Sequence, residues 1–166
     1  MSMSAKEIIA VIAEMIKLHK TFNELAIEKT DIIKKSDIKA LDMLIKKEGA
    51  LIHQLNQLEQ KRMSVVEAFL NRKGLVTEGV TMEQVIEMAP KEEQPILTKL
   101  QRALMSEIDR LKKNNEQNQQ LIEDSLRFVN LSLDLLAPEP EEINYQRPAQ
   151  KNYDSDTKRS IFDSKA

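Results

Sequence analysis

The 166 residues fit a single helical domain, because a hydrophobic content of 41% suffices for a core and only three glycines and five prolines can break long elements. The 25 basic and 27 acidic residues give a net charge of −2, which argues against nucleic-acid binding because that activity needs a surplus of cations. Cysteine is absent, so disulfide bonds and cysteine-bound metals are excluded.

The first predicted helix begins at Ser4. Ser4 and Glu7 have the spacing of a capping box, in which the serine oxygen accepts a backbone N–H and the glutamate reaches back to the cap. Apolar residues then form a heptad seam, which Lys29 interrupts: Ile8, Val11, Met15, Leu18, Phe22, Leu25 and Ile32. Ile9, Ile12 and Ile16 widen this seam, so two neighbouring helices should cover its N-terminal end.

The second predicted helix begins near Asp37, with Ser36 as a candidate cap, and ends before Gly74, which can adopt a left-handed conformation. Its seam contains Leu41, Leu44, Glu48, Leu51, Leu55, Leu58, Arg62, Val65 and Phe69. The two charged members either carry their charges to the periphery or form a buried polar contact that fixes the helix register. Gly49 inside the helix indicates a slight kink or a close helix crossing.

A looser connector follows, and Thr81 and Gln84 predict a capped short helix over residues 82–88 that Pro90 ends. Pro95 suits the first turn of the third long helix. The seam of this helix includes Leu97, Leu100, Leu104, Ile108, Leu111, Asn115, Asn118, Ile122, Leu126, Val129, Leu133 and Leu136. The two asparagines either set the register of the seam or form a polar patch that faces a partner.

Beyond Ala137 the chain is rich in proline and charge, and such a segment cannot bury enough apolar surface to stay ordered. We therefore predict an all-α protein: an antiparallel bundle of three long helices with a short helical connector at residues 4–136, and a flexible polar tail at residues 137–166. The N-terminus lacks a signal-type apolar run, and no segment approaches the ~18 apolar residues of a membrane span. We expect a cytoplasmic protein without membrane insertion.

The sequence offers no catalytic, metal or cofactor-binding site. His19 and His53, the two histidines, lack the Glu-x-x-His spacing of a di-metal bundle, and the three glycines are too scattered for a phosphate-binding loop. No nucleophile elbow accompanies the serines. We therefore expect a binding protein and not an enzyme.

The end of the third long helix carries more apolar residues than one bundle seam needs. They cover more than one helix face: Leu121, Ile122, Leu126, Phe128, Val129, Leu131, Leu133, Leu135 and Leu136. Three long helices can hide part of this surface, and the remainder should stay exposed beside the tail. Exposed apolar surface of this kind indicates a partner site, which an amphipathic partner helix can fill.

The pattern resembles the FlgN-type flagellar export chaperones over residues 4–136. The resemblance rests on the leucine ladder Leu51, Leu55, Leu58 that runs into Arg62, on the loose connector, and on Asn115-x-x-Asn118-x-x-Leu121 before an apolar stretch and a polar tail. It implies a cytoplasmic helical chaperone that binds hook-associated proteins of the hook–filament junction. Such a chaperone prevents their premature assembly and delivers them to the type III export apparatus.

In that family substrate binding is associated with the C-terminal part, which implies a regional set of contact residues here. The set comprises Leu121, Ile122, Leu126, Val129, Leu133, Leu136, Tyr145, Tyr153, Ile161 and Phe162. The chain should be a monomer or a weak homo-oligomer. The competing hypothesis is a structural coiled-coil adaptor of an export or other complex, which would use the same heptads in an extended, self-associating rod.

Overall fold

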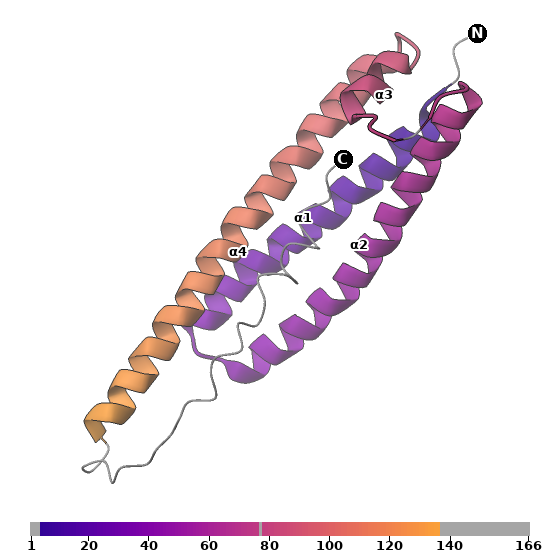
Figure 1. Cartoon of the computed structure of the whole chain (residues 1–166). Coiled ribbons are helices and arrows are strands. Elements are labelled where there is room, and N and C mark those ends of the chain that lie inside the picture. The colour runs from indigo at the N-terminus through magenta and orange to yellow at the C-terminus, as the bar shows by residue number, and fades with distance from the viewer. Residues whose placement is uncertain (1–3, 77, 137–166) are drawn as a thin grey trace. The chain divides into compact units, whose positions relative to one another are not determined.

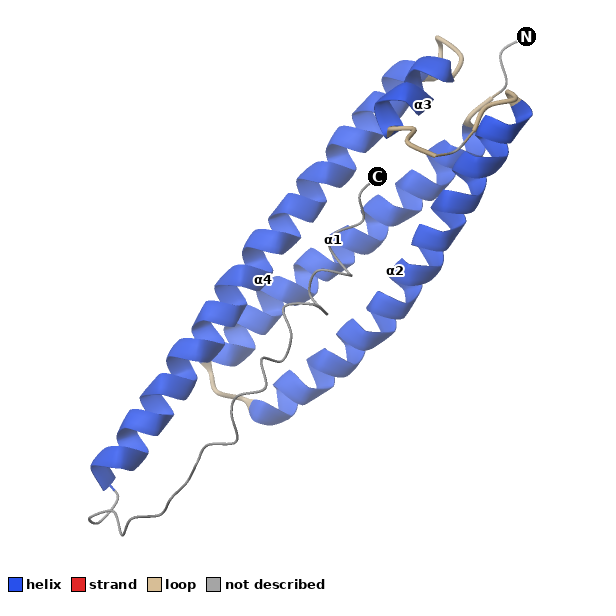
Figure 2. Ribbon diagram, in the orientation of Figure 1, coloured by secondary structure: helices blue, strands red, loops and turns tan. Residues whose placement is uncertain are grey.

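The computed structural model describes residues 4–76 and 78–136, and in this part of the chain it contains four helices and no strand (Figures 1 and 2). The helices are α1 (Lys6–Lys34), α2 (Ile38–Arg72), α3 (Met82–Met88) and α4 (Gln94–Leu136). This arrangement confirms the predicted all-α class, with three long helices and a short helical connector. The predicted polar tail, residues 137–166, lies outside the described residues.

The chain divides into two compact units, Met1–Leu126 and Arg127–Ala166, so the boundary falls within α4. In the first unit α2 runs antiparallel to α1, and α4 runs in the same direction as α1 (Figure 1). The described part of the second unit consists of the last turns of α4. None of the helices in the described ranges is long and apolar enough to cross a membrane.

The core of the first unit is built around α1. This helix contributes the longest series of buried residues, from Ile8 through Ile12 and Ile16 to Ile33, because it packs against two long neighbours. α4 contributes a narrow column in which every seventh residue is buried: Leu97, Leu104, Leu111 and Asn118. The wide apolar stripe of α1 and the narrow one of α4 follow from the number of helices that each must face.

The start of α1 differs from the prediction. Ala5 occupies the cap position and the predicted Ser4–Glu7 box does not form, although Ser4 Oγ accepts the Lys6 N–H (3.2 Å). Instead the Glu93 carboxylate accepts hydrogen bonds from Ser4 Oγ (2.7 Å) and from the Ala5 N–H (2.7 Å). These bonds hold the pKa of Glu93 below its usual value. A charged acceptor supplied by the fold replaces the local glutamate, because hydrogen bonds to a carboxylate are stronger than neutral ones.

The other helix ends follow local sequence more closely. The α2 cap is Asp37, whose Oδ1 accepts the Ala40 N–H (3.1 Å), while Ser36 has a positive φ of 54° and forms the link between helices. The candidate cap at Ser36 was therefore wrong by one residue. Gly74 takes the expected left-handed conformation with φ of 73°. At α3, Thr81 and Gln84 form the predicted capping box.

Gly49 lies in open surroundings, which rules out the close helix crossing. A Cβ atom built there would meet no other atom within 4 Å. We expect Gly49→Ala to raise the free energy of unfolding by about 1 kcal/mol, because alanine loses less backbone entropy in a helix. Urea denaturation followed by circular dichroism measures this change. Gly74→Ala is the control and should be destabilising, since its φ is +73°; a loss of stability in both variants would contradict the prediction.

Candidate functional site

A polar seam joins α1 to α4 in the interior of the first unit. Asn118 is only 2% exposed; its Nδ2 donates to the Ala26 carbonyl (2.8 Å), and its Oδ1 accepts from Thr30 Oγ1 (2.5 Å). A one-turn shift of either helix would leave these groups unpaired in the core. Asn118 therefore sets the helix register and does not face a partner.

A second polar contact lies two turns earlier along the same pair of helices. Asn23 is buried, and its Nδ2 donates to both the backbone carbonyl (3.0 Å) and the Oε2 atom (2.8 Å) of Glu107. The Oδ1 atom of Asn23 accepts a hydrogen bond from Asn114 Nδ2 (3.3 Å). Asn23 was not among the predicted seam residues, and Asn114, not the predicted Asn115, makes the contact. The only sequence signal was a polar residue beside the seam residue Phe22.

Two residues that interrupt their own seams pair with each other. Lys29 Nζ of α1 lies 3.2 Å from Glu48 Oε2 of α2, and these side chains are only 18% and 20% exposed. Glu48 therefore makes an interhelical polar contact, and its role in fixing the helix register stays a prediction. Arg62 differs, because its guanidinium pairs with Glu59 on the same helix. Its side chain is 11% exposed, and this ion pair stays within α2 and links no helices.

His19 is a buried titratable group in the core. It is 4% exposed, and its Nδ1 finds no hydrogen-bond partner in the described part of the chain. Burial lowers the pKa of His19, and the charges of Glu107 on α4 and Glu59 on α2 oppose this shift. Protonation therefore favours the unfolded chain.

Stability should consequently fall on acidification. Because the folded pKa of His19 lies below the unfolded value, its contribution is complete above about pH 6.5 and decreases below it, by up to about 1.4 kcal/mol per pH unit. Urea titrations between about pH 7 and pH 5 measure this slope. His19→Gln should flatten the curve, and an equally steep curve in that variant would assign the acid sensitivity to other groups.

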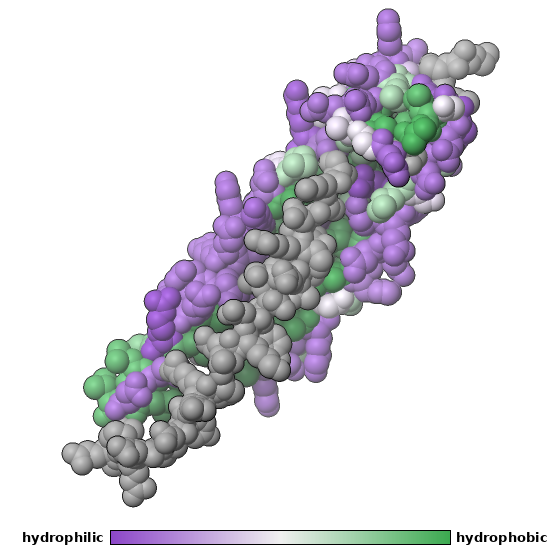
Figure 3. Space-filling model, in the orientation of Figure 1, coloured by the Kyte–Doolittle hydropathy of each residue, from purple (hydrophilic) through white to green (hydrophobic). Residues whose placement is uncertain are grey.

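Apart from His19, these polar residues have partners inside the first unit, and a candidate binding surface lies elsewhere. Near its C-terminal end α4 carries large apolar side chains that are exposed: Leu126 58%, Phe128 70%, Val129 50%, Leu131 59%, Leu133 60%, Leu135 78% and Leu136 81%. Figure 3 shows hydrophobic surface gathered at this end of α4, next to hydrophilic surface along the preceding turns. Such a concentration is unusual for a surface that meets only water.

The heptad of α4 explains the form of this apolar segment, residues 121–136. The column of buried residues that ends at Asn118 continues, seven residues at a time, as Ser125 and Ser132. Large apolar residues flank the two serines on both sides: Leu121, Phe128 and Leu135 on one, and Ile122, Val129 and Leu136 on the other. Small residues between two apolar ridges allow another helix to approach closely.

The predicted contact residues fall into two groups. Leu121 and Ile122 are half-buried, and Leu126, Val129, Leu133 and Leu136 are exposed. The remaining four, Tyr145, Tyr153, Ile161 and Phe162, lie outside the described residues. The predicted contact set left out three residues of the apolar stretch, Phe128, Leu131 and Leu135. These residues are among the most exposed members of the apolar stretch.

The described side chains do not form a metal site, since no three histidine or acidic groups among them are placed to share an ion. Comparison with known proteins gives a family. The family model for the FlgN protein matches residues 1–152. The uncharacterized protein YvyG of Bacillus subtilis (strain 168) is 34% identical over 164 residues, which are 99% of this chain and 100% of that protein. No solved structure matches the chain.

Proposed function

The chain belongs to the FlgN family of flagellar export chaperones, and on this basis we propose that it binds hook-associated proteins of the hook–filament junction in the cytoplasm. In this proposal it keeps these subunits from assembling prematurely and delivers them to the type III export apparatus. It performs no catalysis. The single observation that supports a client-holding role is the exposure of the apolar segment, residues 121–136, on α4.

We propose that the client contributes an amphipathic helix that lies along this segment. The proposal is supported by the row Ser125 and Ser132 between apolar ridges, because a large apolar side chain of the client can rest over each serine. Burying leucine, valine and phenylalanine side chains that are half or more exposed supplies the free energy of association. Segments that would otherwise polymerise are thereby shielded until release.

The proposal extends to the C-terminal tail, residues 137–166, which we treat as a domain apart from residues 4–136. Its large apolar or aromatic side chains include the four predicted contact residues Tyr145, Tyr153, Ile161 and Phe162. A tail that becomes ordered on the client adds contact area but loses affinity to its own ordering, which favours release. A chain that ends after residue 136 should therefore still bind the client, with a higher Kd.

Titration calorimetry with purified hook-associated protein tests the proposal. We expect a complex with a negative heat-capacity change, because apolar surface is buried on binding. Amide exchange should slow at residues 121–136 when the client is added. Binding without any change in this segment would place the client elsewhere, and no binding at a protein concentration of about 100 μM would contradict the client class itself.

A further inference from the structure

A second surface of α4 carries a stripe of positive charge. It comprises Pro95, Lys99, Arg102, Ser106, Arg110 and Lys113, which recur at intervals of three and four and so share one helix face. All six side chains are exposed. Over these five turns the stripe holds four cations and no acidic residue, in a chain whose net charge is −2.

The four cations are left without ion pairs by the rest of the described chain. Some other exposed charges do form ion pairs, for example Lys46 with Asp42 and Lys61 with Glu14. None of Lys99, Arg102, Arg110 and Lys113 has such a partner among the described residues. Unpaired like charges in a row repel each other, which is a cost that a complementary partner removes.

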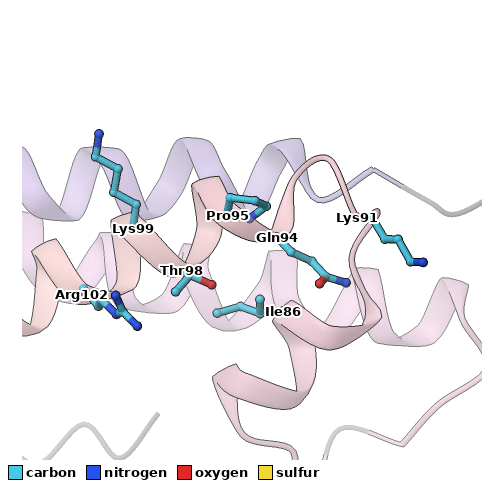
Figure 4. Close-up of a pocket in the computed structure, with 7 residues that line it drawn as sticks. All are labelled: Ile86, Lys91, Gln94, Pro95, Thr98, Lys99 and Arg102. Atoms are coloured by element: carbon cyan, nitrogen blue, oxygen red, sulfur yellow. The ribbon is translucent and has the colours of Figure 1, made fainter.

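The N-terminal end of this basic stripe borders a recess of about 540 Å³ between α3 and α4 (Figure 4). Ile86 and Pro95 give the recess an apolar part, and Lys91, Lys99 and Arg102 give it positive charge. Its walls are fixed, because Gln94 Nε2 donates to the carbonyls of Glu87 (3.2 Å) and Ala89 (3.0 Å) and so ties α4 to the end of α3.

We propose that this basic stripe docks an acidic helical segment of a partner protein. The length of the stripe, about 21 Å from Lys99 to Lys113 at 1.5 Å per residue, suits a helix that lies beside α4 with its carboxylates in a row. The recess receives an apolar side chain at one end of that helix. The site shares no residue with the apolar segment 121–136, so it stands independently of client binding.

A protein partner fits this surface better than a polyanion. Nucleic acid needs a cationic surplus over a broad face, whereas the cations here occupy one narrow stripe and the whole chain is acidic. An apolar recess flanked by cations also offers nothing specific to a phosphate chain, while it suits a leucine between two glutamates. Charge of this kind sets specificity and the association rate more than affinity.

The test uses two synthetic helical peptides of equal composition. In the first, the glutamates have the spacing of the four cations and a leucine sits at one end; in the second, the same glutamates are distributed around the helix. Fluorescence anisotropy with the full chain should show that the first peptide binds more tightly, with an affinity that falls as salt rises. Equal affinity for both peptides would overturn the proposal.

Variants of the full chain locate the site. Lys99→Glu with Arg102→Glu should weaken binding of the first peptide by about tenfold or more. Lys17→Glu with Lys20→Glu is the matched control: this pair has the same spacing and exposure on α1 and the same change in net charge, and it should have little effect. An equal loss of peptide affinity in both variants would show that only net charge matters and would overturn the proposal. The proposal would also be overturned if phosphatidylglycerol vesicles or duplex DNA bound the stripe as strongly as the first peptide does.

Discussion

Replacing Ile122, Leu126 and Val129 by serine is expected to weaken binding of the hook-associated client by about 100-fold or more. Leu126 and Val129 are 58% and 50% exposed and Ile122 is half-buried, so much of their apolar surface remains available to a partner. Each side chain that loses this surface should cost about 1 kcal/mol of binding free energy. The helix content should not change, because the replaced side chains contribute little to the core.

The matched control for this variant removes equally exposed apolar residues from another helix. Ile38, Met43 and Ile45 of α2 are 79%, 63% and 49% exposed, and their replacement by serine should leave client affinity unchanged. Calorimetric titration of both triple variants, with circular dichroism as the test of folding, measures the difference. If the α4 variant kept its affinity, or if both variants lost it alike, the apolar segment 121–136 would not be the client site.

Asn118→Ala is expected to lower the free energy of unfolding by about 2–3 kcal/mol. The substitution removes the donor to the Ala26 carbonyl and the acceptor for Thr30 Oγ1 at a position that is 2% exposed. The Ala26 carbonyl and the Thr30 hydroxyl would then lie near the core without the Asn118 amide as a partner. The penalty for an unsatisfied buried group exceeds the gain from an ordinary hydrogen bond. Urea denaturation gives the change directly.

Two further variants separate the hydrogen bonds from the loss of volume. Thr30→Val keeps the shape of Thr30 and removes its hydroxyl, so the cycle Asn118→Ala, Thr30→Val and the double variant isolates the coupling between the two side chains. We expect the double variant to be more stable than the sum of the single effects implies. Asn115→Ala, at a half-buried position beside the seam, should cost less than Asn118→Ala. An equal cost at both asparagines would show that the seam does not depend on these bonds.

Local signals in the sequence were sufficient for the helices themselves. The heptad rows, the capping box at Thr81 and Gln84, and Gly74 with its positive φ all act within a few residues, so helix type and most helix ends could be predicted from neighbours in the chain. The apolar character of residues 121–136 was equally plain, because composition alone showed more large apolar residues than a single seam can use.

The tertiary structure decided which partners the polar residues find. Glu93, in place of Glu7, accepts the Ala5 N–H at the start of α1. Lys29 forms an ion pair with Glu48, and Asn114 donates a hydrogen bond to Asn23. The two members of each pair are far apart in the sequence. A periodic pattern assigns a residue to a face but does not say which residue lies opposite. The basic stripe on α4 likewise emerged only when its cations proved to form no ion pairs among the described residues, since charge pairing depends on distances in space that the order of residues does not contain.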